Sequence, residues 1–408
     1  MLDFGVQTTP QCHHFVRLWN YEEYNKGDWA SENGYYNMLI DGYKTLTSSV
    51  ESSILSARGP LIVDGAYGVG ALAFTKFVKE CPEDFNLVVE IRNMPAEGEV
   101  NFESGAEHCQ KGRTPPRGFH GEADRGKRCC SIDGDADRIV FHYFDTQGEW
   151  HLCDGDKIAA LFTQFVQERL EKIAPFDTMK PALKVAVVQT AYANGASTAY
   201  MKETLGVEVV MVKTGVKHCH TKAMEFDIGI YFEANGHGTV LFQDTTIDRL
   251  QKLSASVTDE GAKLAIAQLL AAQQLINQSI GDAMSDALAV EACLALKGWS
   301  IQNWNAQLYT DLPSRQTKVI VEDRSILICN ASETKLVSPA SLQKTLGSLM
   351  SEVENGRVFA RPSGTENVVR IYAEAKSQEE ADSLAIKAAQ AVHEAAGGVG
   401  DLPTDFVA

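Results

Sequence analysis

Short apolar runs alternate with helix-spaced stretches along the first three hundred residues. Leu61–Asp64 and residues 86–91 have the length and continuity of buried strands, and residues 71–80 between them have the apolar spacing of a helix. A strand, a helix and a second strand in this order predict a βαβ unit and a mostly parallel sheet. The intervening glycines do not match Gly-x-Gly-x-x-Gly, so a dinucleotide site has only weak support.

The same order of segments recurs further along the chain. Strands are predicted at residues 183–189, 207–212 and 228–232, and a helix at residues 196–205. The repeat suggests an internal duplication, and long helices are expected over residues 247–295. Asn235 and Gly236 stand between two apolar runs, which predicts a hairpin turn.

The last hundred residues have a different pattern. Residues 368–375 alternate between apolar and polar side chains, as a half-exposed strand does. Ser377 and Glu380 form the sequence signature of a capping box, which predicts the start of a helix that ends near Gly397. The pattern indicates an α+β domain after the two α/β units.

Three aspartates stand at alternate positions between two apolar runs. Alternation directs Asp133, Asp135 and Asp137 toward one side of the chain, where their charges repel one another unless a cation offsets them. The donors are hard oxygens without His or Cys in register, so Mg²⁺ is the expected ion. Arg138 can balance the charge or hold a phosphate.

The Asp-x-Asp-x-Asp run has three other interpretations. An Asp-x-Asp-x-Asp run alone is as readily a solvated turn. An EF-hand is excluded, because its sixth position should be Gly and is Arg138, and its twelfth should be Glu and is Phe144. A phosphatase of the haloacid dehalogenase type, with Asp133 as nucleophile, stays open because that chemistry also uses an Asp-x-Asp loop.

Composition and charge narrow the class of protein. The chain has 408 residues, 44% of them hydrophobic and 22% charged, which fits a globular protein of several domains. The net charge of −17 argues against nucleic-acid or anionic-membrane partners. Nine cysteines without Cys-x-x-Cys spacing, and no 18-residue apolar span or signal peptide, predict reduced thiols and a cytoplasmic location.

A second candidate site lies near the C-terminus, in the run from Arg361 to Glu366. Gly364 allows the backbone to approach an anion closely, and the residues beside it offer hydroxyl and N–H donors. Arg361 and Arg370 supply forked cationic donors suited to phosphate. A hairpin turn with two surface arginines is the plainer alternative.

A third candidate is the segment Glu233, Ala234 and Asn235 at the end of a predicted strand. A carboxylate and an amide there can bind vicinal hydroxyls of a sugar, although Asn-Gly is first a turn signal. Lys217 and His218 follow the neighbouring strand and could contact a phosphate or transfer protons. An ordinary helix start without a metal is the plainer interpretation of the residues around His218.

Taken in order, these loops resemble those of the α-D-phosphohexomutase family. The resemblance rests on Asp133 to Arg138, on Glu233 to Gly238, and on Arg361 to Thr365 with Arg370. Residues 188–195, 214–218, 225–229 and 309–313 agree as well, so it extends over nearly all of the chain. The Glu-Ala-Asn-Gly sequence of the second loop resembles the corresponding loop of the family branch that acts on N-acetylglucosamine phosphates.

The resemblance implies a fold, a reaction and a set of site residues. The expected fold is a tandem of three-layer α/β/α domains with mixed sheets, followed by a C-terminal α+β domain. The expected reaction interconverts N-acetylglucosamine 6-phosphate and 1-phosphate, on the route to UDP-N-acetylglucosamine. It passes through a hexosamine 1,6-bisphosphate, and a phosphoserine donates the phosphoryl group next to Mg²⁺.

The expected site residues fall into three groups: the metal ligands Asp133, Asp135 and Asp137; the substrate-binding residues Glu233, Ala234, Asn235, Arg361, Pro362, Ser363, Gly364, Thr365 and Arg370; and the catalytic candidates Arg138, Lys217 and His218. The expected partner is a small phosphosugar, without nucleic acid or membrane. The sequence predicts no oligomeric state.

One family feature has no match. The family's nucleophilic serine lies in a Thr-Ala-Ser-His-Asn-Pro-like loop, and no Ser-His-Asn occurs in the 408 residues. The 408-residue chain is therefore expected to bind substrate without turning it over. The alternatives are a non-catalytic sugar-phosphate-binding paralogue and another phosphohexomutase.

The same comparison predicts the division of the chain into four segments. Residues 1–25 are expected to be the remnant of a first domain, with a strand at residues 5–11 that runs into a turn. The other three are an α/β domain with the metal loop (26–150), an α/β domain with the sugar loop (151–298) and an α+β domain with the phosphate loop (299–408).

Overall fold

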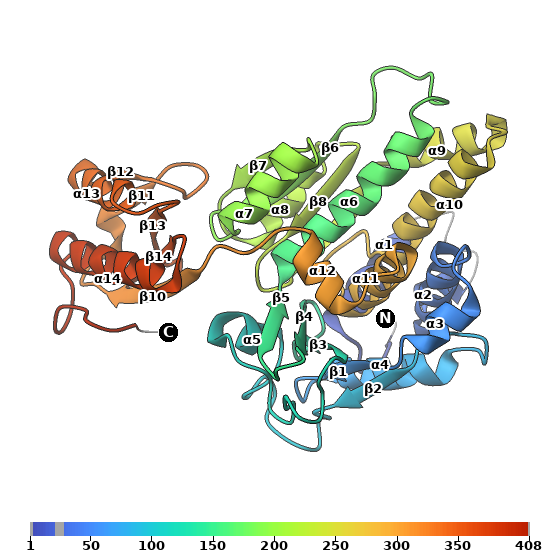
Figure 1. Ribbon diagram of the computed structural model, residues 1–408, viewed down its shortest axis with the longest axis horizontal. Helices are drawn as coiled ribbons and strands as arrows, with labels where there is room; N and C mark the ends of the chain where they lie inside the picture. The colour runs from blue at the N-terminus through green and yellow to red at the C-terminus, as the bar shows by residue number, and fades with distance from the viewer. Residues whose placement is uncertain (1–2, 21–27, 407–408) are drawn as a thin grey trace. The chain divides into compact units, whose positions relative to one another are not determined.

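The computed structural model describes residues 3–20 and 28–406, which form two compact units. The first contains residues 1–187, 205–208 and 220–308, and the second residues 188–204, 209–219 and 309–408. Figure 1 shows the elements of both. Each unit is described by itself below.

A five-stranded mixed sheet carries the first part of the chain, in the order β2-β1-β3-β4-β5. Its strands are β1 (Leu61–Asp64), β2 (Val89–Arg92), β3 (Arg128–Ile132), β4 (Ile139–Phe144) and β5 (Trp150–Cys153). β1 runs parallel to β2 and β3, whereas β3, β4 and β5 are successively antiparallel. All residues of β1, β3 and β4 are buried, which explains their continuous apolar runs.

The first unit also contains most of the helices that precede β10. They are α1 (Thr9–Asn20), the 3₁₀ turn η1 (Asp28–Ala30), α2 (Glu32–Leu46), α3 (Ser52–Ala57), α4 (Val69–Glu80), α5 (Ala106–Gly112), α6 (Gly155–Ile173), α9 (Asp244–Ser256), α10 (Glu260–Leu275), α11 (Ala283–Lys297) and α12 (Ile301–Gln307). α11 is buried along nearly its whole length, as its apolar, alanine-rich sequence requires. Asp282 caps its N-terminus and Gly298, with φ +62°, ends it.

A four-stranded sheet has the order β7-β6-β8-β9. Its strands are β6 (Val185–Thr190), β7 (Glu208–Val212), β8 (Ile228–Phe232) and β9 (Gly238–Phe242). Three short helical segments lie between them in sequence: α7 (Gly195–Ala199), the π-helical turn η2 (Tyr200–Thr204) and α8 (Val216–Ala223). Both sheets place their second strand outside the first and their third on its other side, in keeping with the suggested duplication.

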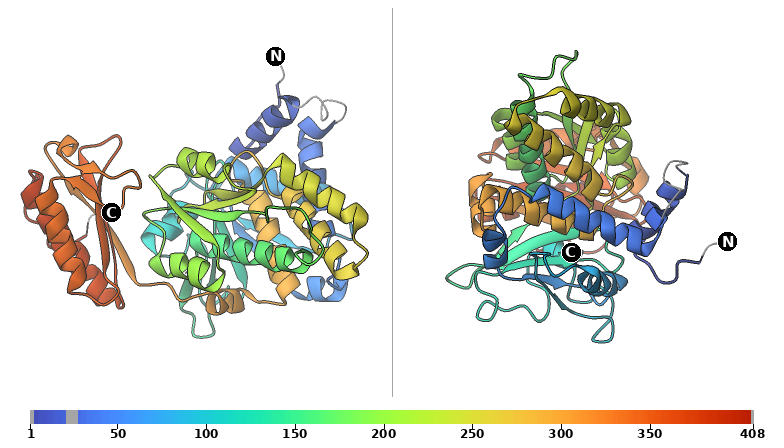
Figure 2. Two further views of the ribbon diagram at one scale, coloured as in Figure 1. Left: turned by 90° about the horizontal axis from the view of Figure 1, so that it is seen from above. Right: turned by 90° about the vertical axis from the view of Figure 1, so that its right-hand side faces the viewer.

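The C-terminal part is an antiparallel sheet in the order β10-β14-β13 with helices packed against it (Figure 2). Its elements are β10 (Ser314–Ile320), the 3₁₀ turn η3 (Arg324–Ile326), β11 (Ile328–Cys329), β12 (Leu336–Ser338), α13 (Ala340–Ser351), β13 (Arg357–Pro362), β14 (Val368–Glu374) and α14 (Gln378–Ala395). Apolar side chains of both helices and all three strands form one core cluster. Ser377 caps α14 by accepting a hydrogen bond from the Glu380 N–H, as expected from its sequence.

The structure confirms the α/β class with mixed sheets and the α+β character of the end of the chain. Two expectations were wrong. The strand expected at residues 5–11 is absent from the described chain, where α1 begins at Thr9, and residues 94–127, which their polar, Gly- and Pro-rich sequence predicts to be one long loop, contain α5. Part of the 1–25 segment lies outside the described residues, and the four-segment division stays a prediction.

Candidate functional site

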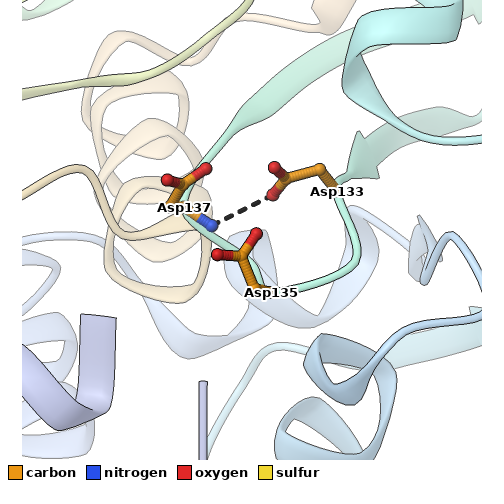
Figure 3. A group of neighbouring side chains, drawn as sticks. All are labelled: Asp133, Asp135 and Asp137. Carbon is orange, nitrogen blue, oxygen red and sulfur yellow. Dashed lines mark hydrogen bonds between the residues drawn. The ribbon is translucent and has the colours of Figure 1, made fainter. Parts of the chain in front are cut away.

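The structure brings the three aspartates of the β3–β4 loop together. Asp133, Asp135 and Asp137 each offer a carboxylate oxygen within 4.8 Å of the other two (Figure 3). Ala136 turns the loop with φ +61°, and its N–H donates to the Asp133 carbonyl at 3.1 Å. We call residues 133–138 the aspartate loop.

Glycines after β1 explain how α4 approaches this loop. A Cβ at Gly68 would lie 2.1 Å from the carbonyl oxygen of Gly134, so only glycine fits there. The Gly70 N–H donates to that same oxygen at 3.3 Å. The Gly-rich run after β1 therefore positions the aspartate loop.

Burial and like charge act strongly on these carboxyls. Burial, followed by the charges of Asp137 and Asp135, raises the pKa of Asp133 to about 8. Burial also opposes the charge of Asp137, but the His237 hydrogen bond, Asp133 and Arg138 outweigh it and hold the pKa of Asp137 below its usual value. Three neighbouring carboxylates repel one another when all are ionised, and a bound divalent cation would offset this repulsion.

One carboxylate oxygen supports this interpretation directly. Asp137 Oδ1 is buried and has no hydrogen-bond donor among the described residues, and Arg138 Nε lies 3.5 Å from it. The Arg138 guanidinium also reaches Glu107 at 3.3 Å. A spare buried oxygen beside two further carboxylates fits an oxygen-preferring ion such as Mg²⁺.

Thr9, at the start of α1, also contacts the aspartate loop. Its hydroxyl donates to Asp135 Oδ2 at 2.7 Å, and its N–H donates to the Asp135 carbonyl at 3.2 Å. Sequence reasoning missed this residue, because its partner is 126 positions away and no local pattern links them. Thr9 fixes the orientation of the Asp135 side chain.

The predicted sugar loop is the hairpin turn between β8 and β9. The Glu233 N–H donates to the His237 carbonyl at 2.9 Å, and Gly236 has φ +86°. Asn235 Oδ1 accepts from the His237 N–H at 3.1 Å, and the Ala234 carbonyl accepts from the Gly155 N–H at 3.2 Å. Hydrogen bonds within the turn and one from the N-terminus of α6 therefore fix its shape.

This hairpin turn lies directly against the aspartate loop. The Ile139 N–H donates to the Gly236 carbonyl at 3.2 Å, and a Cβ at Gly236 would lie 1.8 Å from the Ile139 carbonyl oxygen. His237 Nδ1 lies 3.2 Å from Asp137 Oδ2. The first unit thus joins the predicted metal ligands and sugar-binding residues in one place.

The predicted phosphate loop connects β13 to β14 in the second unit. Arg361 and Arg370 are directly opposed on the two strands, and their side chains are 15% and 40% exposed. Ser363 is buried, and its hydroxyl accepts from the N–H groups of Thr365 and Glu366 at 3.4 Å each. The two arginines therefore extend from neighbouring backbone positions at the base of an exposed turn.

Arg324, which sequence reasoning missed, holds this turn from its other side. Its guanidinium donates to the Glu366 carbonyl at 2.7 Å and to the Gly364 carbonyl at 3.0 Å. One guanidinium that binds two carbonyls of the turn fixes its backbone shape. A Cβ at Gly364 would meet no atom within 4 Å, so there is open space above the turn.

Lys217 and His218 lie near the phosphate loop within the second unit. Burial, then Lys213 and Lys217, lower the pKa of His218, so its imidazole is neutral near pH 7. The Thr214 N–H donates to Glu333 Oε2 at 3.0 Å, and this oxygen lies 3.5 Å from Arg361 Nη1. Lys217 and His218 lie in the first turn of α8, as an ordinary helix start would place them, and Glu333 connects the loop before α8 with the predicted phosphate loop.

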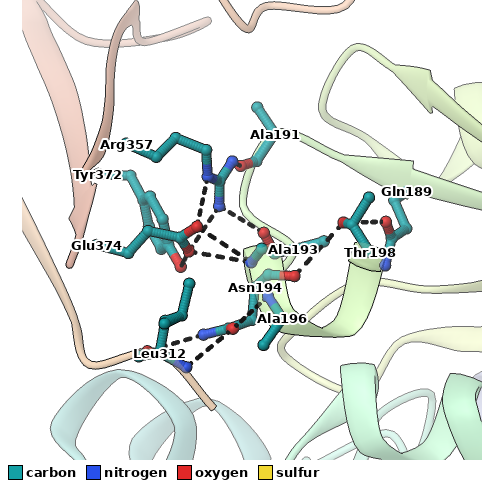
Figure 4. A network of polar contacts seen from close by, with 11 residues as sticks. Gln189, Ala191, Ala193, Asn194, Ala196, Thr198, Leu312, Arg357, Tyr372 and Glu374 are labelled. Atoms are coloured by element: carbon teal, nitrogen blue, oxygen red, sulfur yellow. Dashed lines mark hydrogen bonds and ion pairs between the residues drawn. The ribbon is translucent and has the colours of Figure 1, made fainter. Parts of the chain in front are cut away.

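A buried carboxylate organises the loop after β6 (Figure 4). Glu374 is 1% exposed and accepts from Arg357 Nε at 2.7 Å, the Tyr372 hydroxyl at 2.8 Å and the Gly195 N–H at 3.1 Å. Arg357 also donates to the carbonyls of Ala191 and Ala193, at 2.8 and 2.6 Å. Sequence reasoning missed the Arg357–Glu374 pair, which only the β13–β14 register brings together.

Within the described residues, no helix is long and apolar enough to cross a membrane. None of the nine cysteines is in a disulfide.

Comparison with known proteins agrees with the geometry. A family model described as "Phosphoacetylglucosamine mutase AMG1, domain III" matches residues 154–299. A model described as "Phosphoglucomutase/phosphomannomutase, C-terminal domain" matches residues 349–391. The two matched segments contain the predicted sugar loop and phosphate loop.

Whole-chain relatives extend this result. The phosphoacetylglucosamine mutase of Sus scrofa is 45% identical over 402 residues, which are 98% of this chain and 71% of the relative. That of Arabidopsis thaliana is 46% identical over 401 residues, covering 96% and 70%. The structure of Aspergillus fumigatus N-acetylphosphoglucosamine mutase in complex with GlcNAc-6P and magnesium matches with a TM-score of 0.86 and 41% identity, covering 96% of this chain and 76% of that one. The chain belongs to the phosphoacetylglucosamine mutase family.

Proposed function

We propose that this chain carries the metal, sugar and phosphate sites for the interconversion of N-acetylglucosamine 6-phosphate and 1-phosphate. The observation that carries the proposal is the junction of the aspartate loop with the Glu233–His237 turn, where three converging carboxylates meet a carboxylate and an amide suited to a sugar. The related Aspergillus enzyme was solved with GlcNAc-6P and magnesium. This ligand pair is what the two loops are suited to bind.

Asp133, Asp135 and Asp137 would hold Mg²⁺. The bound ion would offset negative charge on a phosphoryl group during its transfer. Thr9 keeps Asp135 in place and His237 keeps Asp137 in place, so two of the three ligands are oriented by neighbours. Arg138 stands beside Asp137 and Glu107, where its guanidinium can meet a phosphate oxygen.

The sugar is proposed to bind along the turn Glu233, Ala234 and Asn235. Glu233 can accept from two neighbouring hydroxyls. The Asn235 oxygen is already used within the turn, which leaves its NH₂ group for the substrate. This division of donor and acceptor suits a polyol.

The remote phosphate of the sugar is proposed to bind at the turn from Arg361 to Thr365. Arg361 and Arg370 offer bidentate donors, Thr365 and the backbone at Gly364 offer hydrogen bonds, and Pro362 and Ser363 shape the turn. Lys217 would add positive charge from the start of α8, and neutral His218 is available there for hydrogen bonding. Holding one phosphate here orients the other for reaction.

The reaction is proposed to pass through a hexosamine 1,6-bisphosphate, with a phosphoserine as donor. The Aspergillus enzyme was also solved in complex with glucose 1,6-bisphosphate. Because no Ser-His-Asn occurs in the 408 residues, none of the chain's serines takes the donor role by motif. We therefore propose that this polypeptide by itself binds phosphosugar and Mg²⁺ without turnover.

A ³¹P NMR assay tests this proposal. The purified chain is incubated with N-acetylglucosamine 6-phosphate, Mg²⁺ and a trace of glucose 1,6-bisphosphate. We expect binding by calorimetry and no 1-phosphate signal. Formation of the 1-phosphate would refute the absence of turnover, and absence of binding would refute the assignment of the sites.

The chain is further proposed to work in the cytoplasm, as four segments with the boundaries given above (1–25, 26–150, 151–298 and 299–408). Nine free cysteines, several of them buried, suit a reducing compartment. The match at residues 154–299 supports the third segment and the match at 349–391 falls inside the fourth.

A further inference from the structure

Glu333 occupies a strained turn that presents its side chain in a fixed direction. The turn connects β11 to β12, and Glu333 has φ +56°, a conformation that costs a non-glycine residue about 1 kcal/mol. Asn330 holds the turn: its carbonyl accepts from the Glu333 N–H at 3.0 Å, and its side-chain oxygen accepts from the Thr334 N–H at 2.9 Å. Such strain persists where the surrounding contacts fix the residue.

The Glu333 carboxylate contacts both the loop before α8 and the predicted phosphate loop of the second unit. One oxygen, Oε2, accepts from the Thr214 N–H at 3.0 Å and lies 3.5 Å from Arg361 Nη1. The two side chains of this ion pair are 20% and 15% exposed, so solvent screens the pair only in part. At 3.5 Å the contact is looser than the bidentate geometry that Arg361 can form with a phosphate.

Polar atoms around this ion pair are left unused. Thr214 Oγ1 is buried and has no hydrogen-bond partner among the described residues, and the buried Tyr192 hydroxyl and Arg361 Nε interact with one another only loosely. The Arg361 guanidinium lies 5.8 Å from the centre of the Tyr192 ring. Burial opposes the charge on Arg361, but Tyr192 and Glu333 outweigh it and raise the pKa of Arg361. We call Arg361 and the predicted phosphate loop the phosphate clamp. Its guanidinium is charged and does not use all of its hydrogen-bonding capacity, and the Glu333 carboxylate lies at its edge.

We propose that Glu333 is the internal counter-anion of the phosphate clamp: it holds Arg361 while the clamp is empty and yields it to the phosphate of the incoming sugar. This inference rests on the proposed function, since it needs the turn at Arg361 to bind phosphate. Glu333 acts on the substrate through Arg361 and is a positioning residue.

Competition between Glu333 and the substrate phosphate for Arg361 would assist this reaction. A bisphosphate that must turn round between two phosphoryl transfers has to leave the clamp each time, so a clamp that binds too tightly slows the reaction. A carboxylate that returns to Arg361 favours this release. It also keeps the loop at Thr214 next to the clamp in the empty state.

Replacing Glu333 by glutamine separates charge from shape. In Glu333→Gln the side-chain oxygen still accepts from the Thr214 N–H, but the negative charge beside Arg361 is gone. A carboxylate about 6 Å from a bound phosphate, at a dielectric between that of the protein surface and that of water, weakens binding by about tenfold. We therefore expect Glu333→Gln to bind N-acetylglucosamine 6-phosphate about tenfold more tightly by calorimetry, and to release it more slowly in stopped-flow displacement.

The matched control removes a similar charge elsewhere in the same unit. Glu352 ends α13, is 60% exposed and lies 3.9 Å from Lys387. β13, about 20 Å long, separates its end of the sheet from the clamp. Glu352→Gln should leave the affinity unchanged. Unchanged or weaker binding by Glu333→Gln would overturn the proposal.

Two further variants keep the outcomes apart. If wild type binds and Arg361→Gln does not, the proposed function stands, and Glu333→Gln alone decides this inference. If wild type fails to bind, the proposed function fails with it. Should Glu333→Gln melt early by circular dichroism, Glu333→Asp retains the charge but withdraws it from Arg361. Tighter binding by Glu333→Asp supports the counter-anion, and wild-type affinity overturns it.

Discussion

Binding of Mg²⁺ to the aspartate loop should release a proton. In the metal-free protein, burial and the charges of Asp137 and Asp135 raise the pKa of Asp133 to about 8. At pH 7 this carboxyl is therefore protonated in about nine molecules of ten, whereas a carboxylate that binds Mg²⁺ is ionised. Asp137 stays ionised, because the pKa of its carboxyl is held below the usual value.

The pKa sets the size and direction of the effect. At pH 7 we expect release of about 0.9 proton per ion bound, and at pH 9 about 0.1. Apparent affinity for Mg²⁺ should rise about tenfold per pH unit below pH 8 and level off above it. Because the pKa of Asp133 is raised, low pH favours the metal-free protein and high pH favours the metal-bound protein.

Calorimetry in two buffers measures the released proton. Mg²⁺ is titrated into the chain near pH 7 in PIPES and in Tris, whose ionisation enthalpies differ strongly, and the difference in observed heat gives the number of protons. Asp133→Asn should bind more weakly and release none, whereas Asp145→Asn, in an exposed turn outside the site, should behave as wild type. Equal heats in the two buffers for wild type would refute the electrostatic account of the loop.

Two further predictions concern the supports of the first unit. Glu291 is fully buried and lies 2.9 Å from Arg128 and 3.5 Å from Arg58, so Glu291→Ala should lower the free energy of unfolding by about 3–5 kcal/mol in urea denaturation, and Glu260→Ala, at an 85% exposed side chain, by a small fraction of that. A loss below about 1 kcal/mol for Glu291→Ala would mean that the two arginines find other partners. Gly236→Ala should cost about 3 kcal/mol and abolish sugar-phosphate binding, since its Cβ would lie 1.8 Å from the Ile139 carbonyl oxygen, whereas Gly206→Ala, at φ +64° in open space, should cost only about 1 kcal/mol. Equal losses for the two glycine variants would show that the backbone contact is not needed.

Local signals in the sequence predicted much of the fold and of the site. The hairpin at Asn235–Gly236 is confirmed, as are the α14 start at Ser377 and the convergence of Asp133, Asp135 and Asp137, because each depends on residues a few positions apart. α1 was missed because its N-terminal turn signals resemble those of a loop, and its apolar positions pack against other parts of the chain.

The supporting contacts could not be predicted, since they join distant segments. Thr9 meets Asp135 across 126 positions, and Glu291 meets Arg128 across 163. The Arg357–Glu374 pair depends on the register of β13 and β14, which the turn sequence alone does not fix. Glu333 reaches Arg361 only because its turn adopts a left-handed backbone that no glycine marks.

The measurement that tests the central claim most directly is calorimetric titration of the purified chain with N-acetylglucosamine 6-phosphate, with and without Mg²⁺, for wild type and Arg361→Gln. The account predicts binding by wild type that is tighter with Mg²⁺ and at least tenfold weaker in Arg361→Gln, because a bidentate charged contact is lost. Binding that ignores both Mg²⁺ and Arg361, or no binding at all by a folded chain, would contradict it.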